Sequence, residues 1–473
     1  MAGFVGRRRE LDELRAQLDV VEHGSRDARG VAVLLRGRRR VGKSRLAEEL
    51  VARADVPHVT FQAARGAPVE HELVGIAQAV AASDLPNAGV AADTRPTTLT
   101  AALTLLAAAV PDERPSVVVI DEVPWLLEGV PGGAGELQRV WDRALSRKPV
   151  LLLLLGSDLA MMEQLTRADQ PFHGRAVEMV LHALSPRDVA RMTGTSGAEA
   201  FDAHLVTGGQ PLIAQEWRRG EQLTEFLARS FTSPLSALVA TGTRVLDSEF
   251  PEGELTRRVL TAIGAGERTF SRIRDAAGGL QPTSLTRVLG TLTTKRVVAV
   301  DTPLSTAPSR ESRYRIADPA LRFWLPFVAP ALHEVDRDRP DLAMARVERS
   351  FTSWRGRAVE PLVRDAVSRT LLDSQWPQVT DVGGWWPRTN TPEIDLVGTD
   401  GRPARHVAFV GTTKWRTTRP VTRAEVVRLA TDAQVVPGVD PGTPLVAVCP
   451  AGVEKDAPVA ASWTADDLLA TWP

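Results

Sequence analysis

A glycine-rich segment near the N-terminus has the residue types and spacing that bind phosphate groups. It fits the pattern GxxxxGK[ST] and reads Gly37, Arg38, Arg39, Arg40, Val41, Gly42, Lys43 and Ser44, followed by Arg45. Glycines let backbone N–H groups curl around phosphate oxygens, and the start of a helix adds a favourable dipole. In this pattern Lys43 reaches the β- and γ-phosphates and Ser44 ligates Mg²⁺. The segment predicts a site for ATP and Mg²⁺; the alternative is a chance glycine-rich turn.

Two adjacent carboxylates follow an apolar run further along the chain. Asp121 and Glu122 come directly after residues 117–120, which read as a buried strand. A carboxylate at the end of such a strand can hold the Mg²⁺ shell, a role we assign to Asp121. Its neighbour Glu122 is placed to orient or deprotonate the attacking water. The alternative is an acidic turn at a strand end. Together with Lys43, the pair predicts hydrolysis of bound ATP.

Two more polar residues could complete a catalytic set. Ser157 ends the next apolar run, and it could sense the γ-phosphate or the water if that strand lies between the two phosphate-handling strands. A helix N-cap is an equally good interpretation of Ser157. Arg175 could stabilise the charge of the transition state as an arginine finger, in cis, or in trans within a homo-oligomer. A simple surface arginine is the alternative for Arg175.

Alternating strand-like and helix-like segments must position these residues. The apolar, strand-like runs are 31–36, 58–63, 116–121, 150–157 and 176–184. Helical patterns cover 43–54 and a long alanine-rich stretch over about 70–110. Continuous apolar runs suit parallel strands that helices cover on both faces. We therefore expect an α/β P-loop domain with a parallel sheet over residues 1–215.

The composition excludes several other kinds of protein. The 473 residues carry 57 basic and 58 acidic side chains, so the net charge of −1 rules out a uniformly basic nucleic-acid-binding surface. A single cysteine, Cys449, excludes an internal disulfide and a cysteine-rich zinc site. The longest apolar run, 150–155, is far shorter than the about 20 residues of a membrane-spanning helix. The N-terminus also lacks the apolar stretch of a secretory signal, so we expect a cytoplasmic protein without membrane contact.

The pattern changes after residue 215. Over 216–332, three short amphipathic segments precede two strand-like segments, 295–301 and 313–318, which are the parts of a winged helix. An apolar helix is expected over 319–332 and a charged linker over 333–341. Residues 342–473 combine helices with four strand-like runs and predict a third, small α/β domain. The polar residues of the winged helix that could contact DNA phosphates are Ser284, Thr286, Arg287, Lys295 and Arg296. A module that contacts a protein partner is the alternative.

Three further segments give the chain its resemblance to a known family. They read Phe4-Val5-Gly6-Arg7-Arg8-Arg9-Glu10-Leu11, Thr207-Gly208-Gly209-Gln210-Pro211-Leu212 and, over 315–324, RIADPALRFW. With the P-loop and the acidic pair, these segments resemble the STAND and AAA+ ATPases of the archaeal-ATPase type. The resemblance implies that Val5 and Gly6 lie beside the adenine and that Pro211 approaches the nucleotide base.

The C-terminal segment resembles part of a second pattern, because members of this family often end in a domain similar to the PD-(D/E)xK nucleases. There a helix Glu, a strand Asp and a Glu-x-Lys bind Mg²⁺ and activate water. The matching positions are Glu360, Asp395, Thr412 and Lys414. Thr412 stands where the pattern has Glu, so the site loses an anionic ligand. We expect a restriction-endonuclease-like fold with a degenerate site, unless Glu425 on the following helix supplies the missing carboxylate.

The motifs together favour an ATP-binding and ATP-hydrolysing switch. ATP and Mg²⁺ would bind at residues 37–44, Asp121 and Glu122, and the nucleotide would shift the winged helix and the C-terminal domain. The expected partner is DNA, held weakly through local basic patches, or a protein. One alternative is an ATP-gated DNA nuclease, against which Thr412 argues. The other is an interaction scaffold that holds ATP without hydrolysing it, against which Glu122 argues.

Overall fold

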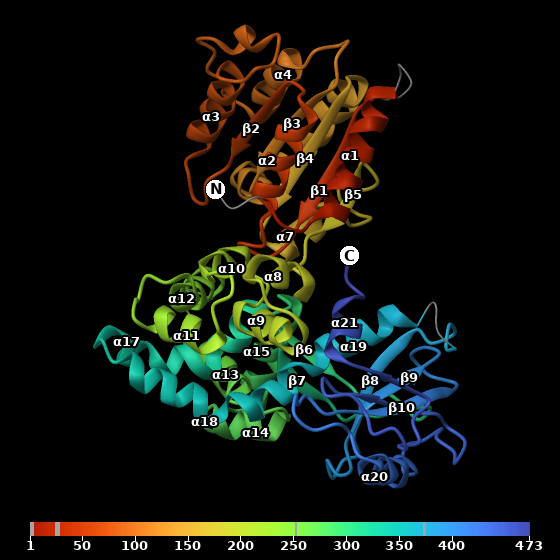
Figure 1. Ribbon diagram of the computed structural model, residues 1–473. Helices are drawn as coiled ribbons and strands as arrows, with labels where there is room; N and C mark the ends of the chain where they lie inside the picture. The colour runs from red at the N-terminus through yellow and green to blue at the C-terminus, as the bar shows by residue number, and fades with distance from the viewer. Residues whose placement is uncertain (1–3, 24–28, 251–252, 372–374) are drawn as a thin grey trace. The chain divides into compact units, whose positions relative to one another are not determined.

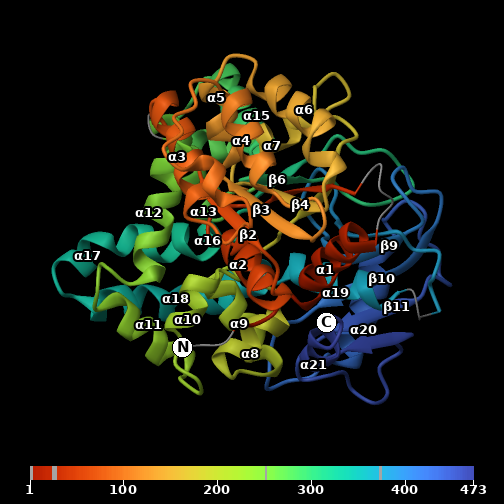
Figure 2. The ribbon, with the colours of Figure 1, turned by 90° about the horizontal axis from the view of Figure 1, so that it is seen from above.

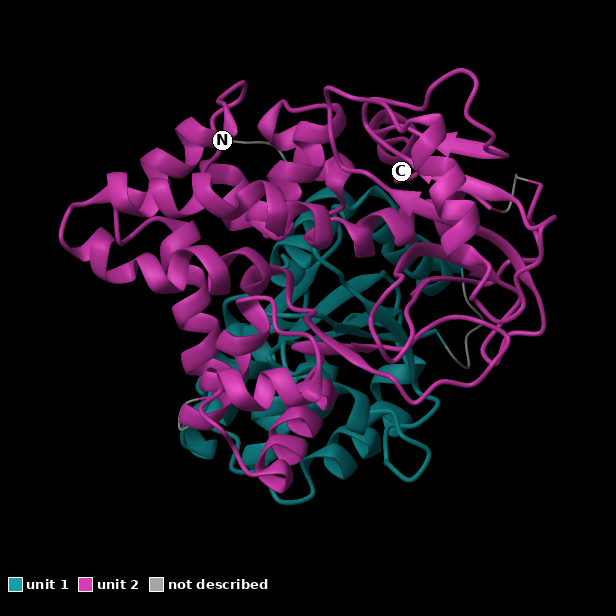
Figure 3. Ribbon diagram, turned by 90° about the horizontal axis from the view of Figure 1, so that it is seen from below, with its two compact units in different colours: residues 1–183 teal, residues 184–473 magenta. Residues whose placement is uncertain are grey.

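The computed structural model describes residues 4–23, 29–250, 253–371 and 375–473 of the chain (Figure 1). The chain divides into two compact units, residues 1–183 and 184–473, which Figure 3 shows in different colours. All of the predicted phosphate-handling residues belong to the first unit, and the predicted winged helix and nuclease-like segments belong to the second. The division into three domains at 215 and 342 stays a prediction.

The first unit is built on a five-stranded sheet in the order β2-β3-β4-β1-β5. Its strands are β1 (Val31–Arg36), β2 (His58–Gln62), β3 (Ser116–Asp121), β4 (Val150–Gly156) and β5 (Ala176–Val180). Every neighbouring pair is parallel. The apolar runs of the sequence thus form the strands expected of them. Because the strands are parallel, their carboxyl ends lie on one edge of the sheet, where the P-loop, Asp121 and Ser157 follow β1, β3 and β4.

Helices cover both faces of this sheet, as continuous apolar strands require. On one face, α1 (Arg8–His23) and α2 (Lys43–Ala54) pack Leu14 and Leu46 against Val33, Leu35 and Val119. The other face is covered by α3 (Val69–Ala81), α4 (Leu99–Ala109) and α6 (Gly133–Arg143), whose apolar side chains pack against the alternate residues of the same strands. Figure 2 shows the strands between these two layers.

The alanine-rich stretch over 70–110 is not one helix. It forms α3, a short 3₁₀ turn η1 (Ala88–Ala91) and α4. Two prolines explain the difference: Pro86 and Pro96 lie in the gaps, and proline disfavours helix for the residue before it as well as lacking an N–H group. Thr98 then begins α4, and its side chain accepts a hydrogen bond from the N–H of Ala101.

The second unit starts as a helical layer. Its first helices are α8 (Pro186–Thr193), α9 (Gly197–Thr207), α10 (Pro211–Glu216), α11 (Leu223–Phe231), α12 (Ala237–Glu249), α13 (Glu254–Gly264), α14 (Phe270–Ala276) and α15 (Pro282–Thr294). The last three are followed by an antiparallel ribbon of β6 (Val298–Asp301) and β7 (Arg313–Ile316). The three helices and the ribbon therefore lie where the sequence predicts them.

The charged segment 333–341, predicted as a linker, is largely helical. It contains α17 (Leu332–Asp336) and the start of α18 (Pro340–Ala358). Val335 is buried and packs with Val347 of α18 in the helical core, which gives this polar segment one apolar anchor. The apolar stretch before it is helical throughout, as α16 (Pro319–Phe323), a π-helical turn η3 (Trp324–Val328) and a 3₁₀ turn η4 (Ala329–Ala331).

A mixed five-stranded sheet of order β12-β11-β10-β9-β8 forms the C-terminal part of the second unit. Its elements are α19 (Glu360–Thr370), β8 (Asp381–Trp385), β9 (Ile394–Thr399), β10 (Val407–Thr413), α20 (Arg423–Ala433), β11 (Leu445–Val448), β12 (Ala461–Trp463) and α21 (Ala465–Leu469). Strands β8, β9 and β10 are antiparallel, whereas β10, β11 and β12 are parallel. This sheet packs on α9, where the Phe201 ring contacts the rings of Trp415 and Trp472.

Within the described ranges, we find no helix that combines the length and the apolar character needed to cross a membrane.

Candidate nucleotide-binding site

The P-loop joins β1 to α2, and its backbone lies too close to its surroundings for most side chains. A Cβ atom on Gly37 would lie 2.5 Å from the carbonyl oxygen of Leu181, so only glycine fits there. Gly42, directly before α2, has a φ of 97°, in the left-handed region that favours glycine. The two glycines of the motif thus hold the loop against the sheet, and the N–H groups of the first turn of α2 remain available to phosphate oxygens.

Lys43 is held inside this loop. Its side chain is 6% exposed, and Nζ donates hydrogen bonds to the carbonyl oxygens of Gly37 at 2.8 Å and Arg38 at 3.1 Å. Burial lowers the pKa of Lys43 to about 8, and the nearby carboxylates of Glu122 and Asp121 oppose that shift. The ammonium therefore lacks a directly paired anion, and a phosphate group would supply one.

Ser44 and Asp121 lie side by side at the ends of the helix and strand that carry them. The Ser44 Oγ donates a hydrogen bond of 2.5 Å to Asp121 Oδ2, and Asp121 is 5% exposed. A hydroxyl and a carboxylate are the hard oxygen ligands that Mg²⁺ accepts alongside phosphate and water. The pair fits the predicted Mg²⁺ position. Across the described parts of the chain, no three His, Cys, Asp or Glu side chains gather as a metal cluster.

Glu122 and Ser157 are brought together by the strand order. Because β4 lies between β3 and β1, Ser157 follows the strand that separates the P-loop from the acidic pair. The Glu122 Oε2 accepts hydrogen bonds from Ser157 Oγ at 2.9 Å and from Ser157 N at 3.2 Å. The N-cap of α7 (Leu159–Leu165) is Asp158, which accepts from the N–H groups of Ala160 and Met161. Ser157 is therefore not the N-cap of α7, and its hydrogen bonds orient the Glu122 carboxylate.

The sequence analysis missed the structural role of Arg7. Its guanidinium donates hydrogen bonds to the P-loop carbonyl of Val41 at 3.0 Å and to the carbonyl of His182 at 2.5 Å, and it pairs with Glu10. Arg7 thus ties the N-terminal segment, with Val5 and Gly6, to the loop. The motif had placed only Val5 and Gly6 at the nucleotide. The signal was an arginine directly after glycine, both of which take a positive φ here.

The remaining predicted residues differ in their relation to Lys43. Burial has the largest effect on the pKa of Lys43, and Arg39 lies close enough for its positive charge to lower that pKa further. Arg175 forms an ion pair with Asp142 of α6, with Nε 2.8 Å from Oδ1, so its role as a finger stays a prediction. Arg45 pairs with Glu48 and Glu49 on the exposed side of α2. Arg40 has a φ of 65°, which shapes the loop. Pro211 opens α10 in the second unit, and its approach to the base likewise stays a prediction.

The predicted nuclease-like residues do lie together at the C-terminal sheet. Asp395 on β9 accepts hydrogen bonds of 2.9 Å from the Thr412 hydroxyl and from the Thr413 N–H, and Lys414 Nζ lies 4.0 Å away. Thr412 is 6% exposed. The threonine that replaces the expected carboxylate therefore donates to Asp395 instead of adding negative charge beside it.

Glu360 and Glu425 differ in their relation to this cluster. Burial raises the pKa of Glu360 to about 7, the Arg364 guanidinium opposes the shift and the Asp395 charge adds to it. Arg364 bridges the two, because it donates to Glu360 Oε2 and to the backbone oxygen of Asp395. Glu425 instead caps α20 and pairs with Arg416 at 2.6 Å, and the hydrogen bond from that guanidinium lowers its pKa to about 2. Its carboxylate is engaged there, and nothing places it at Asp395.

Comparison with known proteins agrees with this geometry. Residues 3–153 match the model of the AAA ATPase domain, and residues 324–427 match a family described as archaea bacterial proteins of unknown function. The chain is 22% identical over 418 residues to the uncharacterized protein MJECL04 of Methanocaldococcus jannaschii, covering 87% of this chain and 88% of that protein.

Solved structures of similar proteins are more distant. The Walker-type ATPase PABY2304 of Pyrococcus abyssi is 19% identical with a TM-score of 0.48, covering 68% of this chain and 96% of its own. The ORC2 protein of Aeropyrum pernix, solved as ADPNP–ADP complexes, is 18% identical with a TM-score of 0.44, covering 73% of this chain and 96% of its own. The predicted fold class is confirmed: a parallel-sheet P-loop ATPase domain of the AAA kind precedes a helical region and a small mixed-sheet domain.

Proposed function

We propose that the protein is an ATP-hydrolysing switch whose nucleotide state controls the second unit. The observation that carries this proposal is a set of two hydrogen bonds at one edge of the sheet. One joins Ser44 to Asp121, and the other joins Ser157 to Glu122. The first pair is suited to hold Mg²⁺ and the second to aim a general base. A domain that only stored ATP would have no use for an oriented carboxylate beside the metal position.

In this proposal each residue has a separate task. Ser44 and Asp121 would hold Mg²⁺, which when bound would supply positive charge against the phosphates. Lys43 moves from the carbonyl oxygens of its own loop to the phosphates, which supply the anion that its buried ammonium lacks. Glu122 accepts the proton of the attacking water, and Ser157 keeps that carboxylate in one orientation. The Arg7 guanidinium keeps the loop in place throughout.

The output of the switch is proposed to be a DNA or protein contact made by the winged-helix segment, α13 to α15 with β6 and β7. Arg287 is exposed on α15, whereas the Lys295 ammonium lies 3.5 Å from Glu249 and over the ring of Phe250. Arg272 and Arg296 are exposed on the same segment, so the cations that could contact phosphate form a small local group. Any DNA binding should be weak and should fall steeply with salt, because it rests on a few phosphate contacts.

Hydrogen exchange of the full chain tests the switch. Exchange rates in residues 184–473 should differ between the ADP-bound wild type and the ATP-bound Glu122→Gln variant by about 5- to 150-fold at the responding helices, the usual range of allosteric coupling. The Lys43→Ala variant is the control, and exchange in its residues 184–473 should be the same with ATP as with ADP. Identical exchange of the second unit in all nucleotide states would show that no signal leaves the ATPase domain.

For the C-terminal sheet we propose a nuclease-like domain that does not cut DNA. The support is chemical: Thr412 gives the site a hydrogen-bond donor where a metal needs a carboxylate, and Arg364 adds a positive charge beside Glu360. Under this proposal Asp395 serves the fold, since it satisfies the Thr412 hydroxyl and the Thr413 N–H.

The Asp395→Ala variant separates the two roles. We expect it to lose about 1–3 kcal/mol of unfolding free energy, because two donors lose their acceptor. Neither this variant nor the wild type should cut plasmid DNA with Mg²⁺ or Mn²⁺, with or without ATP. Asp365→Ala, at an exposed ion pair with Arg369 on α19, is the matched control and should change stability little. Cleavage by the wild type that Asp395→Ala abolishes would establish the ATP-gated nuclease instead.

A further inference from the structure

The second unit contains a cavity of about 740 Å³ whose lining is rich in arginine. One wall is a single face of α18, because Arg346, Arg349, Ser353 and Arg357 recur at helical spacing. The facing wall comes from the end of α13, the loop after it, β7, α16 and the π-helical turn η3. Its size lies within the range of about 300–1,000 Å³ typical of small-molecule sites. None of the predicted P-loop residues lines it.

The charges of this cavity are not balanced. Seven arginines line it, namely Arg268, Arg315, Arg322, Arg346, Arg349, Arg357 and Arg364, against two carboxylates, Asp301 and Glu360. Four of these arginines have carboxylate partners: Arg268 and Arg346 pair with Glu393 and Glu334, Arg315 with Asp301, and Arg364 with Glu360. Arg322, Arg349 and Arg357 form no ion pair with any residue that the structure describes.

Arg322 is the most informative of the three. Burial and the neighbouring Arg315 lower its pKa to about 10, and the more distant carboxylates of Asp301 and Asp318 oppose the shift. The hydrogen bonds of its guanidinium go to the backbone oxygens of Ala358 at 3.4 Å and Ile316 at 3.5 Å. These are long, weak bonds for a charge held among protein atoms. A buried cation without a directly paired anion is destabilising, so proteins that keep one usually give it a partner. The partner here would be an anion in the cavity.

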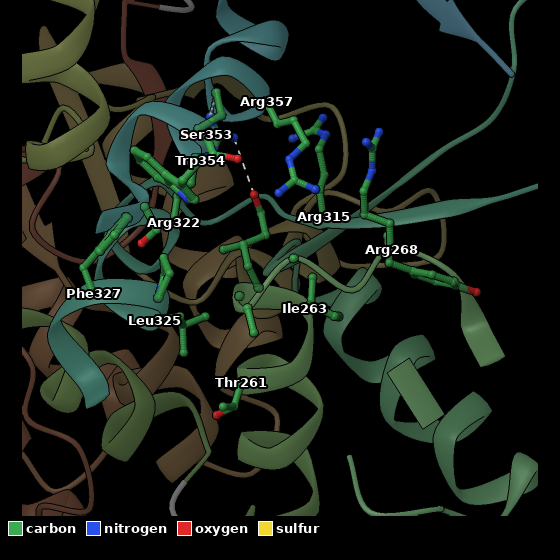
Figure 4. A pocket seen from close by; sticks show the side chains of 18 of the residues that line it. Thr261, Ile263, Arg268, Arg315, Arg322, Leu325, Phe327, Ser353, Trp354 and Arg357 are labelled. Carbon is green, nitrogen blue, oxygen red and sulfur yellow. Dashed lines mark hydrogen bonds between the residues drawn. The ribbon is translucent and has the colours of Figure 1, made fainter. Parts of the chain in front are cut away.

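The other side of the cavity is apolar and rigid. Trp354, Phe327 and Leu325 lie opposite the gathered guanidinium groups of Arg268, Arg315 and Arg357 (Figure 4). The Trp354 ring is fixed edge-on against Phe327 and Phe323, at centroid distances of 5.3 and 5.7 Å. Arg322 lies beside these apolar residues (Figure 4). The cavity thus offers a group of cations at one side and, at the other, a flat apolar surface with one further guanidinium. A ligand that satisfies both has an anionic end and a planar ring.

From these features we propose that the cavity binds a free mononucleotide, separately from the P-loop. Its phosphates would contact Arg322, Arg349 and Arg357, because guanidinium groups match phosphate oxygens in geometry and charge. Its base would lie against Trp354 and Phe327. Glu360 and Arg364 line the same cavity, and Arg364 also donates to the backbone oxygen of Asp395, so an occupant would sit beside the nuclease-like site. This inference does not depend on ATP hydrolysis at the P-loop.

Calorimetric titration of the full chain with ATP, and in parallel with AMP, tests the proposal. Wild type should bind two molecules of ATP per chain, and Lys43→Ala should retain one. Adding Arg349→Ala and Arg357→Ala to the Lys43→Ala background should weaken that remaining binding at least tenfold. The control in the same background is Arg388→Ala, an exposed arginine that does not line the cavity; it should leave the affinity unchanged. Binding that is absent in Lys43→Ala, or unchanged by the two arginine substitutions, would overturn the proposal.

Two further measurements distinguish the ligand and the role of the charge. In the first, short duplex DNA and AMP compete with ATP for the Lys43→Ala protein. If the DNA displaces ATP at a lower concentration than AMP does, the arginines bind DNA and the proposal of a mononucleotide site is overturned. Arg322→Met should weaken the binding of ATP to the Lys43→Ala protein at least tenfold. It should not lower the thermal midpoint of the unliganded protein, because the buried guanidinium forms no ion pair there and its two hydrogen bonds are long. A lower midpoint with normal ATP binding would make Arg322 a structural residue and count against the site.

Discussion

ATP hydrolysis is expected to slow by about 10²- to 10⁴-fold when Glu122 is replaced by glutamine, the usual contribution of a general base. The reason is geometric and chemical. Glutamine keeps the length of the side chain and can still accept from the Ser157 hydroxyl, which lies 2.9 Å from Oε2, but its amide cannot take a proton from water. ATP binding should stay within a few-fold of wild type, because Lys43, Ser44 and Asp121 are untouched.

Steady-state phosphate release and equilibrium ATP binding should be measured on the same preparations. Glu128→Gln is the matched control, since Glu128 is exposed on the helix α5 (Val123–Gly129) that Glu122 precedes. Ser157→Ala should lie between the two, because the carboxylate remains but loses the hydroxyl that aims it. Equal hydrolysis rates for wild type and Glu122→Gln would remove the catalytic role. A wild type that binds ATP and releases no phosphate would favour the scaffold.

Replacement of Lys43 by alanine should weaken ATP binding at the P-loop by about 100-fold or more. Each hydrogen bond from a charged group contributes about 1.5–3 kcal/mol, and the ammonium is expected to contact two phosphates. In the free protein the same side chain is buried, and burial lowers its pKa to about 8. Its removal should therefore cost little stability in the absence of nucleotide. The affinity for ATP would then fall while the stability of the nucleotide-free protein stays nearly the same.

Titration with a fluorescent ATP analogue, together with thermal unfolding without ligand, checks this prediction. Arg53→Ala is the control, because Arg53 lies on the same helix and forms an exposed ion pair with Glu49. Unchanged affinity in Lys43→Ala would mean that the loop binds no phosphate in the expected way. A large drop in the thermal midpoint of Lys43→Ala would mean that instability alone could explain a loss of binding. In that case Lys43→Met, which fills the same space, would show whether the loss comes from the missing ammonium or from the lower stability.

Much of the ATPase domain could be predicted because its signals are local. Each strand of the first sheet is a continuous apolar run, and the P-loop needs only glycine, lysine and serine at fixed spacing. Pro86 and Pro96 also indicate the breaks in the 70–110 stretch, but its high alanine content favoured the prediction of one long helical stretch. The helices at 333–341 were hidden for the opposite reason. Their charges suggested a linker, whereas one buried valine, Val335, anchors the segment to the core.

Contacts between distant segments could not be predicted in the same way. The arginine directly after Gly6 hints at a special turn, but the sequence does not indicate that the Arg7 guanidinium reaches Val41 and His182. The missing carboxylate at Thr412 was apparent, but the hydrogen bond from its hydroxyl to Asp395 depends on the pairing of β9 with β10. The arginine-lined cavity is a stronger case, since its walls come from elements spread over about a hundred residues. Its charge imbalance appears only when all of them are in place.

The backbone of Glu122 has a consequence for engineering this protein. With a φ of 53° it occupies the left-handed region, which costs a non-glycine residue about 1–3 kcal/mol. Glycine would relieve that cost, so selection for heat resistance alone should enrich Glu122→Gly. The same change would delete the carboxylate that Ser157 orients. Heat-resistant isolates recovered without an ATPase screen should therefore include inactive ones that fold better than the natural sequence, and this residue is the first place to look for them.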